Sequence, residues 1–337
     1  MKHIVCFGEI LLRMSSPGME PLLRPPALEG YFGGAEANVA VSLSCLGQRA
    51  SLVSVVPDNP LGDACLGELR RHGVDTTCIQ RSTHRLGLYL LIPAGPLRPA
   101  QVHYDRAYSG FALAPSSCYD WPALLDGADL LHVSGITAAL GEKPLAALRD
   151  AIATAERYGV RVSFDCNFRP SLWRGREADA VAVLADLARS ADLMFCGARD
   201  AASLFGGDYD NRPAAESFSL AAEAVFAACP KLRWLATTHR RIHAVDEHTL
   251  TGSLADRDGV SSSMTYTIRP VVDRIGSGDA YAAGLLHALC EGADRGHAVR
   301  FATAAAVLKH GVRGDFNPST AMDVRRLIDD GGLDVRR

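Results

Sequence analysis

The sequence DRIGSGDAYAAG, from Asp273 to Gly284, carries the strongest local signal in the chain. The small residues Gly276, Ser277 and Gly278 come directly before a run of helix-forming residues, so we predict a helix from 280 to 291. The start of a helix leaves backbone N–H groups unpaired and directs the positive end of the helix dipole at its surroundings. Glycines let such a backbone approach a phosphate closely. The stretch therefore predicts an anion-binding site.

Asp279 is unexpected in such a site, because an anion site should repel a second anion. A carboxylate beside a phosphate binds protons more tightly, which suits a general base that takes a proton from an attacking hydroxyl. The alternative, favoured by this segment alone, is that Asp279 caps the helix. A dinucleotide-binding motif is excluded because Tyr281 stands where its third glycine would be, and none of the four lysines follows a glycine as a P-loop requires.

A second pair of glycines precedes another predicted helix. Gly33 and Gly34 come directly before the helix predicted from 35 to 47, and Asn38 lies on its first turn. Glycines at this point allow close approach of another group to the backbone, and the Asn38 amide is placed to hydrogen-bond a polyol. An ordinary glycine turn into a helix explains the same residues equally well.

A third polar segment follows a buried strand. Asp165, Asn167 and Arg169 come directly after the predicted strand 161–164. Ligands of open α/β sheets bind outside the carboxyl ends of the strands, where these side chains are expected. Arg169 can bind an anion with two parallel hydrogen bonds. The alternative is a surface loop with an ion pair.

Strands and helices alternate along most of the chain, which predicts an α/β fold with a mostly parallel sheet between helices. The predicted strands are 4–8, 52–56, 130–133, 161–164, 193–195, 234–237 and about 264–268. The predicted helices are 35–47, 63–72, 143–159, 177–189, 280–291 and 297–310. The pattern changes between Leu86 and Ala114, where 86–92 and 101–104 predict antiparallel strands around a proline-rich turn. With the segment 13–30, they are expected to form a small separate sheet that acts as a lid.

Composition excludes several other classes of protein. The chain has 337 residues and a net charge of −3, which argues against a nucleic-acid partner. Nine cysteines without a C-x-x-C pair exclude the common zinc spacings and a disulfide framework. The N-terminus lacks the pattern of a secretory signal, and no stretch reaches 18 uninterrupted apolar residues. We therefore expect a cytoplasmic protein without a membrane partner.

Together the three polar segments resemble the PfkB (ribokinase-like) carbohydrate kinases, and most closely the 2-keto-3-deoxygluconate kinases. The resemblance also includes Gly8–Glu9, Tyr104–Asp105–Arg106 and the terminal 309–317. It implies a three-layer α/β/α fold in one domain over 1–337, with lid segments at about 12–32 and 85–114. It further implies transfer of the ATP γ-phosphoryl group to the terminal hydroxyl of the sugar acid, supported by Mg²⁺.

The resemblance assigns roles to particular positions. Asp279 corresponds to the catalytic base, and Gly276, Ser277 and Gly278 form the anion hole with it. The sugar positions, which also include Asp279, are Gly34, Asn38, Tyr89, Tyr104, Arg106 and Arg169. The nucleotide positions are Asp165, Asn167, Arg240, Gly276, Gly278, Lys309 and Gly314. Two arginines beside the sugar imply a charged substrate, unless each pairs with a nearby carboxylate such as Asp105.

Two segments depart from the family pattern. The family's Asn-x-x-Glu, which organises Mg²⁺, is replaced by 197–200, where only Asp200 can act indirectly on the metal. Its Lys-x-Gly turn near the nucleotide is replaced by 237–241. These changes leave open a sugar-acid sensor without catalysis, or a kinase for fructose or 5-keto-2-deoxygluconate. An exposed edge of the lid sheet favours a homo-oligomer, a dimer or higher.

Overall fold

A ten-stranded sheet forms the centre of the computed structural model, which describes residues 1–24, 26–95 and 97–330. In spatial order its strands are β13 (Gly259–Ser262), β12 (Glu247–Asp256), β11 (Trp234–Ala244), β10 (Leu193–Phe195), β9 (Arg161–Asp165), β8 (Leu130–Ser134), β1 (His3–Phe7), β4 (Arg49–Pro57) and β5 (Ile79–Ser82), with β14 (Tyr266–Ile268) beside β12. From β11 to β5 every neighbouring pair is parallel. The predicted mostly parallel sheet is confirmed.

The antiparallel edge of this sheet was not predicted. β11 continues far beyond the predicted 234–237 and forms a long hairpin with β12, which also pairs with β13 and β14. The segment 237–241, expected to replace a turn near the nucleotide, is therefore extended strand. The outer half of β11, from Arg240 to Ala244, is exposed. Its residues are therefore mostly polar or charged and lack the apolar pattern by which a strand is predicted.

Helices cover both faces of the sheet, so the predicted three layers are confirmed. One face carries α1 (Ala35–Cys45), α2 (Pro60–Arg71), α10 (Ser277–Cys290), α11 (Arg295–Lys309) and α12 (Ala321–Asp330). The other carries α3 (Gly110–Leu113), α4 (Trp121–Leu124), α5 (Gly135–Ala139), α6 (Glu142–Tyr158), α7 (Glu177–Arg189), α8 (Ala198–Phe205) and α9 (Ala214–Ala228), with 3₁₀ turns at Ser116–Cys118 and Pro170–Trp173. Six of these helices were not predicted from the sequence: α3, α4, α5, α8, α9 and α12.

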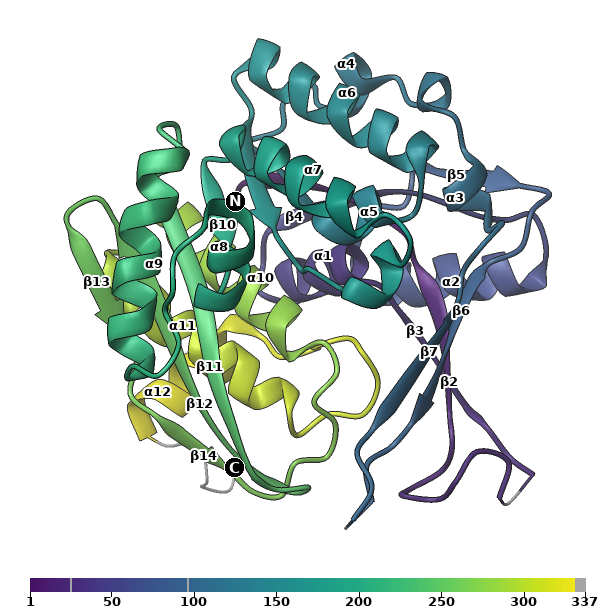
Figure 1. Ribbon diagram of the computed structural model, residues 1–337. Helices are drawn as coiled ribbons and strands as arrows, with labels where there is room; N and C mark the ends of the chain where they lie inside the picture. Colours follow the sequence, from purple (N-terminus) through teal and green to yellow (C-terminus); the bar gives the residue numbers. More distant parts are fainter. Residues whose placement is uncertain (25, 96, 331–337) are drawn as a thin grey trace.

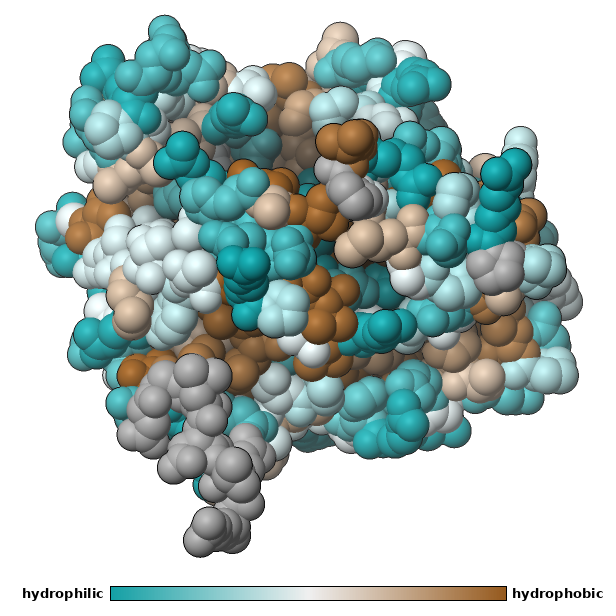
Figure 2. Space-filling view, turned by 90° about the horizontal axis from the view of Figure 1, so that it is seen from below, coloured by the Kyte–Doolittle hydropathy of each residue, from teal (hydrophilic) through white to brown (hydrophobic). Residues whose placement is uncertain are grey.

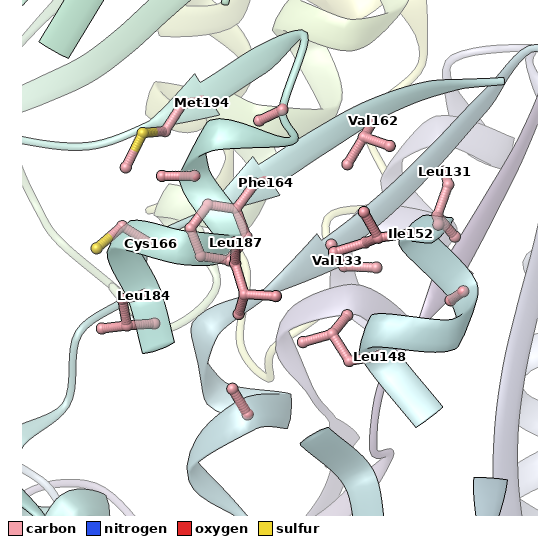
Figure 3. Close-up of a cluster of buried hydrophobic side chains, with 14 of the residues drawn as sticks. Leu131, Val133, Leu148, Ile152, Val162, Phe164, Cys166, Leu184, Leu187 and Met194 are labelled. Atoms are coloured by element: carbon pink, nitrogen blue, oxygen red, sulfur yellow. The ribbon is translucent and has the colours of Figure 1, made fainter. Parts of the chain in front are cut away.

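Each strand supplies side chains to both cores, because successive residues of a strand point to opposite faces. Leu130 belongs to the core under α1 and α10, whereas its neighbour Leu131 belongs to the core under α6 and α7. Figure 3 shows this second core, in which side chains of β8 and β9 lie against those of α6 and α7. Burial is therefore two-sided: every residue of β8 from Leu130 to Ser134 is buried, the polar His132 and Ser134 included.

A separate four-stranded sheet stands beside the main body, at the right of Figure 1. Its order is β3 (Glu29–Gly33), β2 (Leu11–Ser15), β6 (Gly87–Ile92) and β7 (Gln101–Asp105). The strands come from both predicted lid segments; β6 and β7 are antiparallel as expected, whereas β2 and β6 are parallel. Residues 25 and 96 of the predicted lid segments, and residues 331–337 of the predicted domain, lie outside the described residues. No helix in the described ranges is long and apolar enough to cross a membrane.

Candidate active site

A cavity of about 840 Å³ lies between the small sheet and the ends of strands β9 and β10. Viewed from below, the surface is hollowed between apolar and hydrophilic side chains (Figure 2). The cavity brings together residues from distant parts of the chain, between Leu11 and Asp315. Every predicted site residue except Lys309 and Gly314 lines it: Gly34, Asn38, Tyr89, Tyr104, Arg106, Asp165, Asn167, Arg169, Asp200, Arg240, Gly276, Ser277, Gly278 and Asp279.

The backbone at the start of α10 faces this cavity. Gly276 is the N-cap residue and has a φ of 81°, a left-handed conformation that favours glycine. A Cβ atom at this position would also lie 2.1 Å from the backbone oxygen of Asp315. Within the described part of the chain, no acceptor bonds the backbone N–H groups of Gly278 and Asp279. The helix start therefore has the free N–H groups that the prediction of an anion-binding site requires.

Asp279 is held by a side chain from the other end of the chain. Asn38, on α1, donates from Nδ2 to the Asp279 carboxylate at 2.6 Å, and its Oδ1 accepts from the Gly34 N–H at 3.2 Å. Asn38 is thus fixed at both ends of its amide and sets the orientation of the carboxylate. The alternative of Asp279 as a helix cap is wrong, because it lies in the first turn and hydrogen-bonds Asn38 instead.

Two carboxyl groups of the cavity have strongly raised pKa values. Burial raises the pKa of Asp279 to about 7, with a smaller contribution from the charge of Asp315. Burial and the charge of Asp279 raise the pKa of Asp165 to about 8, although Arg169 opposes both shifts. Asp165 also accepts a hydrogen bond from the backbone N–H of Asn167 at 3.1 Å. Carboxyl groups tuned to near neutral pH are suited to proton transfer.

Three arginines line the cavity without a carboxylate within ion-pair distance among the described residues: Arg169, Arg240 and Arg274. Although Arg240 is exposed overall, partial burial of its guanidinium in the cavity wall and repulsion by Arg274 and Arg169 lower its pKa, so the three positive charges lie close together. This arrangement attracts polyanions such as phosphates. Arg274 was given no role in the sequence analysis, although it stands within the DRIGSGD motif.

Arg106, which was predicted to contact the sugar, is paired with a carboxylate of the protein. Its side chain is buried, and its guanidinium pairs with Glu9, with an Nε–Oε2 distance of 2.7 Å. Ser109 donates to the same carboxylate. Asp105, the partner considered from the sequence, pairs with Arg85 instead. Arg106 is therefore neutralised within the protein, and Arg169 is exposed, so the argument from two buried unpaired arginines is wrong.

A buried ionic network connects the small sheet to the anion-binding loop. Arg13, on β2, lies 2.6 Å from Asp273 and 2.9 Å from Asp315 through its two terminal nitrogens. The Tyr89 hydroxyl, on β6, donates to Asp315, whose pKa burial raises to about 6. Partners more than 200 residues apart leave no local signal, so the sequence analysis missed this network.

Lys309 and Gly314 lie behind the loop and not in the cavity. Lys309 is fully buried, and its ammonium donates to the backbone oxygen of Val312 at 2.9 Å. Burial lowers the pKa of Lys309 to about 8. The Gly314 N–H donates to Asp273 at 3.1 Å. Both residues support the loop that carries Gly276, and neither lines the cavity.

Asp200 lies in the first turn of α8, at the edge of the cavity. Burial raises the pKa of Asp200, whereas a hydrogen bond from the Gly197 backbone opposes the shift. Together with Asp165, it offers carboxylate oxygens, which are the ligands that Mg²⁺ prefers. The donor atoms at this edge of the cavity therefore fit a hard cation.

Comparisons with known proteins agree with this geometry. A family model described as pfkB family carbohydrate kinase matches residues 1–322. A 2-dehydro-3-deoxygalactonokinase of Haloferax volcanii is 31% identical over 335 residues and covers 99% of both chains. A solved PfkB family carbohydrate kinase from Listeria grayi is 36% identical with a TM-score of 0.92, covering 98% of this chain and 100% of that one. The solved 2-dehydro-3-deoxygluconokinase of Thermotoga maritima is 33% identical with a TM-score of 0.91, covering 97% and 98%.

These matches extend over almost the whole chain and include the segment 273–279 and both β-sheets. The resemblance drawn from the sequence motifs is confirmed. The chain belongs to the pfkB family of carbohydrate kinases.

Proposed function

We propose that this kinase transfers the γ-phosphoryl group of ATP to the terminal hydroxyl of 2-keto-3-deoxygluconate (2-dehydro-3-deoxygluconate), giving the 6-phosphate. The observation that carries the proposal is the environment of Asp279. Its carboxylate is held by Asn38 beside unpaired backbone N–H groups, in a cavity that also contains three arginines without carboxylate partners. The name of the similar Thermotoga maritima enzyme supports the same substrate.

In the proposed reaction the sugar oxygen forms a bond to the γ-phosphorus, while the bond from that phosphorus to the bridging oxygen of ADP breaks. The Asp279 carboxylate accepts the hydroxyl proton. The N–H groups of Gly278 and Asp279 stabilise negative charge on the transferred group, as expected for phosphoryl transfer. A pKa of about 7 makes Asp279 a stronger base than an ordinary aspartate.

We propose that Mg²⁺ is held near Asp165 and Asp200, directly or through water. Within the described residues, neither carboxylate has a lysine or arginine at ion-pair distance, and both line the cavity. When bound, the ion neutralises part of the charge of the phosphate oxygens. Asp165 keeps its orientation through the hydrogen bond from Asn167.

Arg169 is proposed to recognise the sugar carboxylate. Because Arg106 is neutralised by Glu9, the preference for an acid rests on Arg169, whose guanidinium is exposed at the rim and has no described ion-pair partner. Gly34 and Tyr104 also line the cavity and are proposed to contact the sugar. Tyr89 is proposed to act there through its bond to Asp315 instead of through substrate.

The activity is tested by measuring ADP formation from MgATP with a panel of acceptors. The panel contains 2-keto-3-deoxygluconate, 5-keto-2-deoxygluconate, fructose and ribose. We expect the first to be used best, and Asp279→Asn to lower turnover by about 10²–10⁴-fold with sugar binding kept. Asp126→Asn, an exposed carboxylate outside the cavity, is the control. Calorimetric sugar binding without ADP formation at any Mg²⁺ concentration would favour a sensor and contradict the kinase.

The role of Arg169 is tested separately with a matched variant of the same loop. Arg169→Ala should lower kcat/KM for the sugar acid by about 2–4 kcal/mol, the scale of a lost charge-assisted contact. Arg174→Ala, an exposed arginine five residues along, should change it little. If Arg169→Ala reduces activity on the acid and on a neutral sugar equally, Arg169 does not bind the carboxylate.

The epimeric acid 2-keto-3-deoxygalactonate is a second candidate substrate. The Haloferax volcanii relative, which matches the chain over its full length, carries that name. The two acids differ only in the orientation of one hydroxyl, so the same carboxylate contact serves both. The ratio of kcat/KM values for the two purified acids decides between them.

We also propose that the kinase is a homodimer formed through the small sheet. Among the described residues no strand pairs with the outer edge of its strand β7, which exposes Val102 with an accessible fraction of 40%. Exposed edges commonly pair with another chain. Light scattering should give a dimer mass, and Val102→Lys should shift it toward the monomer. A wild-type monomer at micromolar concentration would contradict the dimer.

A further inference from the structure

Two cysteines stand opposite each other at the edge of the active-site cavity. Cys166 directly follows β9, and Cys196 directly follows β10. These strands are parallel and pair Asp165 with Phe195, so the next residue of each strand is a cysteine. Both thiols are free and buried. Figure 3 shows Cys166 beyond the end of its strand.

A carboxylate completes this cluster. One carboxylate oxygen of Asp200 and the sulfur atoms of Cys166 and Cys196 all lie within 4.8 Å of one another. In the described part of the chain this is the one group of three histidine, cysteine or acidic side chains close enough to share an ion. Cys196 and Asp200 also line the cavity, so the cluster is open to a further ligand from that side.

We propose that Cys166, Cys196 and Asp200 form a binding site for a thiophilic divalent cation, Zn²⁺, which shares only Asp200 with the proposed Mg²⁺ site. In a tetrahedral zinc site, bonds of about 2.0–2.3 Å place neighbouring donor atoms roughly 3.5–3.8 Å apart. The three atoms therefore need to move by only about 1 Å. Water or a phosphate oxygen from the cavity supplies the fourth ligand.

The donor set selects this class of metal. Mg²⁺ avoids sulfur, whereas thiolates favour zinc and other soft ions. Buried cysteines usually act as small apolar residues, but an apolar role does not require a carboxylate beside both sulfurs. Binding releases the two thiol protons to solvent. Two thiolates and one carboxylate with Zn²⁺ leave a net charge of −1, which Arg169 across the cavity partly offsets.

Zinc at this site would inhibit the kinase. This consequence rests on the proposed function, in which Asp200 takes part in holding Mg²⁺. A carboxylate bound to zinc is no longer available to Mg²⁺, and the zinc ion also occupies space at the phosphate end of the cavity. The free enzyme should therefore lose MgATP-dependent turnover when zinc binds and regain it when a chelator removes the zinc.

The metal site is tested on the reduced full-length protein by titration with Co²⁺, a spectroscopic substitute, and with Zn²⁺ against a chromophoric chelator. We expect one equivalent of metal and a sulfur-to-cobalt charge-transfer band. Cys166→Ala and Cys196→Ala should each weaken zinc binding by more than about 100-fold, since even indirect contacts to a metal are worth 10–100-fold. Cys118→Ala and Cys229→Ala, which alter cysteines elsewhere, should bind as the wild type does.

A third variant, Asp200→Asn, keeps both sulfur atoms and therefore tests the site even if the cysteine variants misfold. Thermal unfolding shows whether each variant is folded. Asp200→Asn should weaken zinc binding by about 10-fold or more. Zinc binding by a Cys166→Ala/Cys196→Ala double variant equal to that of the wild type would overturn the site. So would a cobalt complex without the sulfur band. If zinc-free protein forms no ADP from MgATP and the sugar acid, the proposed function is overturned. The metal titration does not depend on that result and tests the zinc site separately.

Discussion

Replacing Asp279 by asparagine should stabilise the protein while it removes most of the activity. Asparagine keeps the size of the side chain and an oxygen that can accept the hydrogen bond from Asn38, which is 2.6 Å long in the wild type. The replacement removes only the negative charge. Charged groups placed for catalysis are a common source of strain in a fold, and their removal often raises stability.

The magnitude follows from the pKa of Asp279, which burial raises from an ordinary 3.8 to about 7. A carboxyl group with a raised pKa favours the folded state when it is protonated. Its contribution is therefore complete below about pH 4 and is lost as the pH rises to about 7. At about 1.4 kcal/mol for each pKa unit, the charged form costs at most roughly 4 kcal/mol. The cavity admits water, so we expect about half of this, ~2 kcal/mol.

Urea unfolding of the wild type and of Asp279→Asn measures this effect. The variant should be more stable by about 2 kcal/mol near pH 8 and by about 1 kcal/mol near pH 5.5. Asp126→Asn should show no such dependence on pH. In the wild type, kcat/KM should rise with pH, reach half its maximum near pH 7 and level off near pH 8, as the Asp279 carboxyl group loses its proton. An asparagine variant less stable than the wild type near pH 8 would refute the reasoning.

Three further replacements follow from the contacts described above. Asp200→Ala should raise the Mg²⁺ concentration for half-maximal activity by roughly 10-fold with the KM for sugar unchanged; an unaltered Mg²⁺ titration would count against it. Gly33→Ala should lower the free energy of unfolding by about 1–3 kcal/mol, because its Cβ would lie 2.1 Å from a carboxylate oxygen of Asp315; Gly67→Ala, with open space around it, should not be destabilising. Arg106→Ala should lower the free energy of unfolding by about 3–5 kcal/mol, because the buried carboxylate of Glu9 loses its countercharge. A urea midpoint equal to that of the wild type would contradict this prediction.

Much of the site was predictable because its motifs are local. The glycines before α10, the polar residues after β9 and Asn38 on the first turn of α1 each stand at a junction between elements. In an open α/β sheet such junctions meet at the carboxyl ends of the strands, so separate motifs predict one cavity. Prediction failed for β11, whose exposed half lacks an apolar pattern, and for Lys309, whose burial follows from packing behind the loop.

The sequence by itself determined the alternation of strands and helices, the small sheet and the identity of Asp279 as the candidate base. Periodicity and turn residues act over a few positions, and they can be read without knowing what lies across the molecule. Only the tertiary structure decided the partners: Asn38 for Asp279, and Glu9 for Arg106. Those pairs join residues 241 and 97 positions apart, and a charged side chain has several candidate partners in any sequence. The folded structure selects one partner, because the energies of ion pairs and hydrogen bonds depend on the distance between the groups and on their burial.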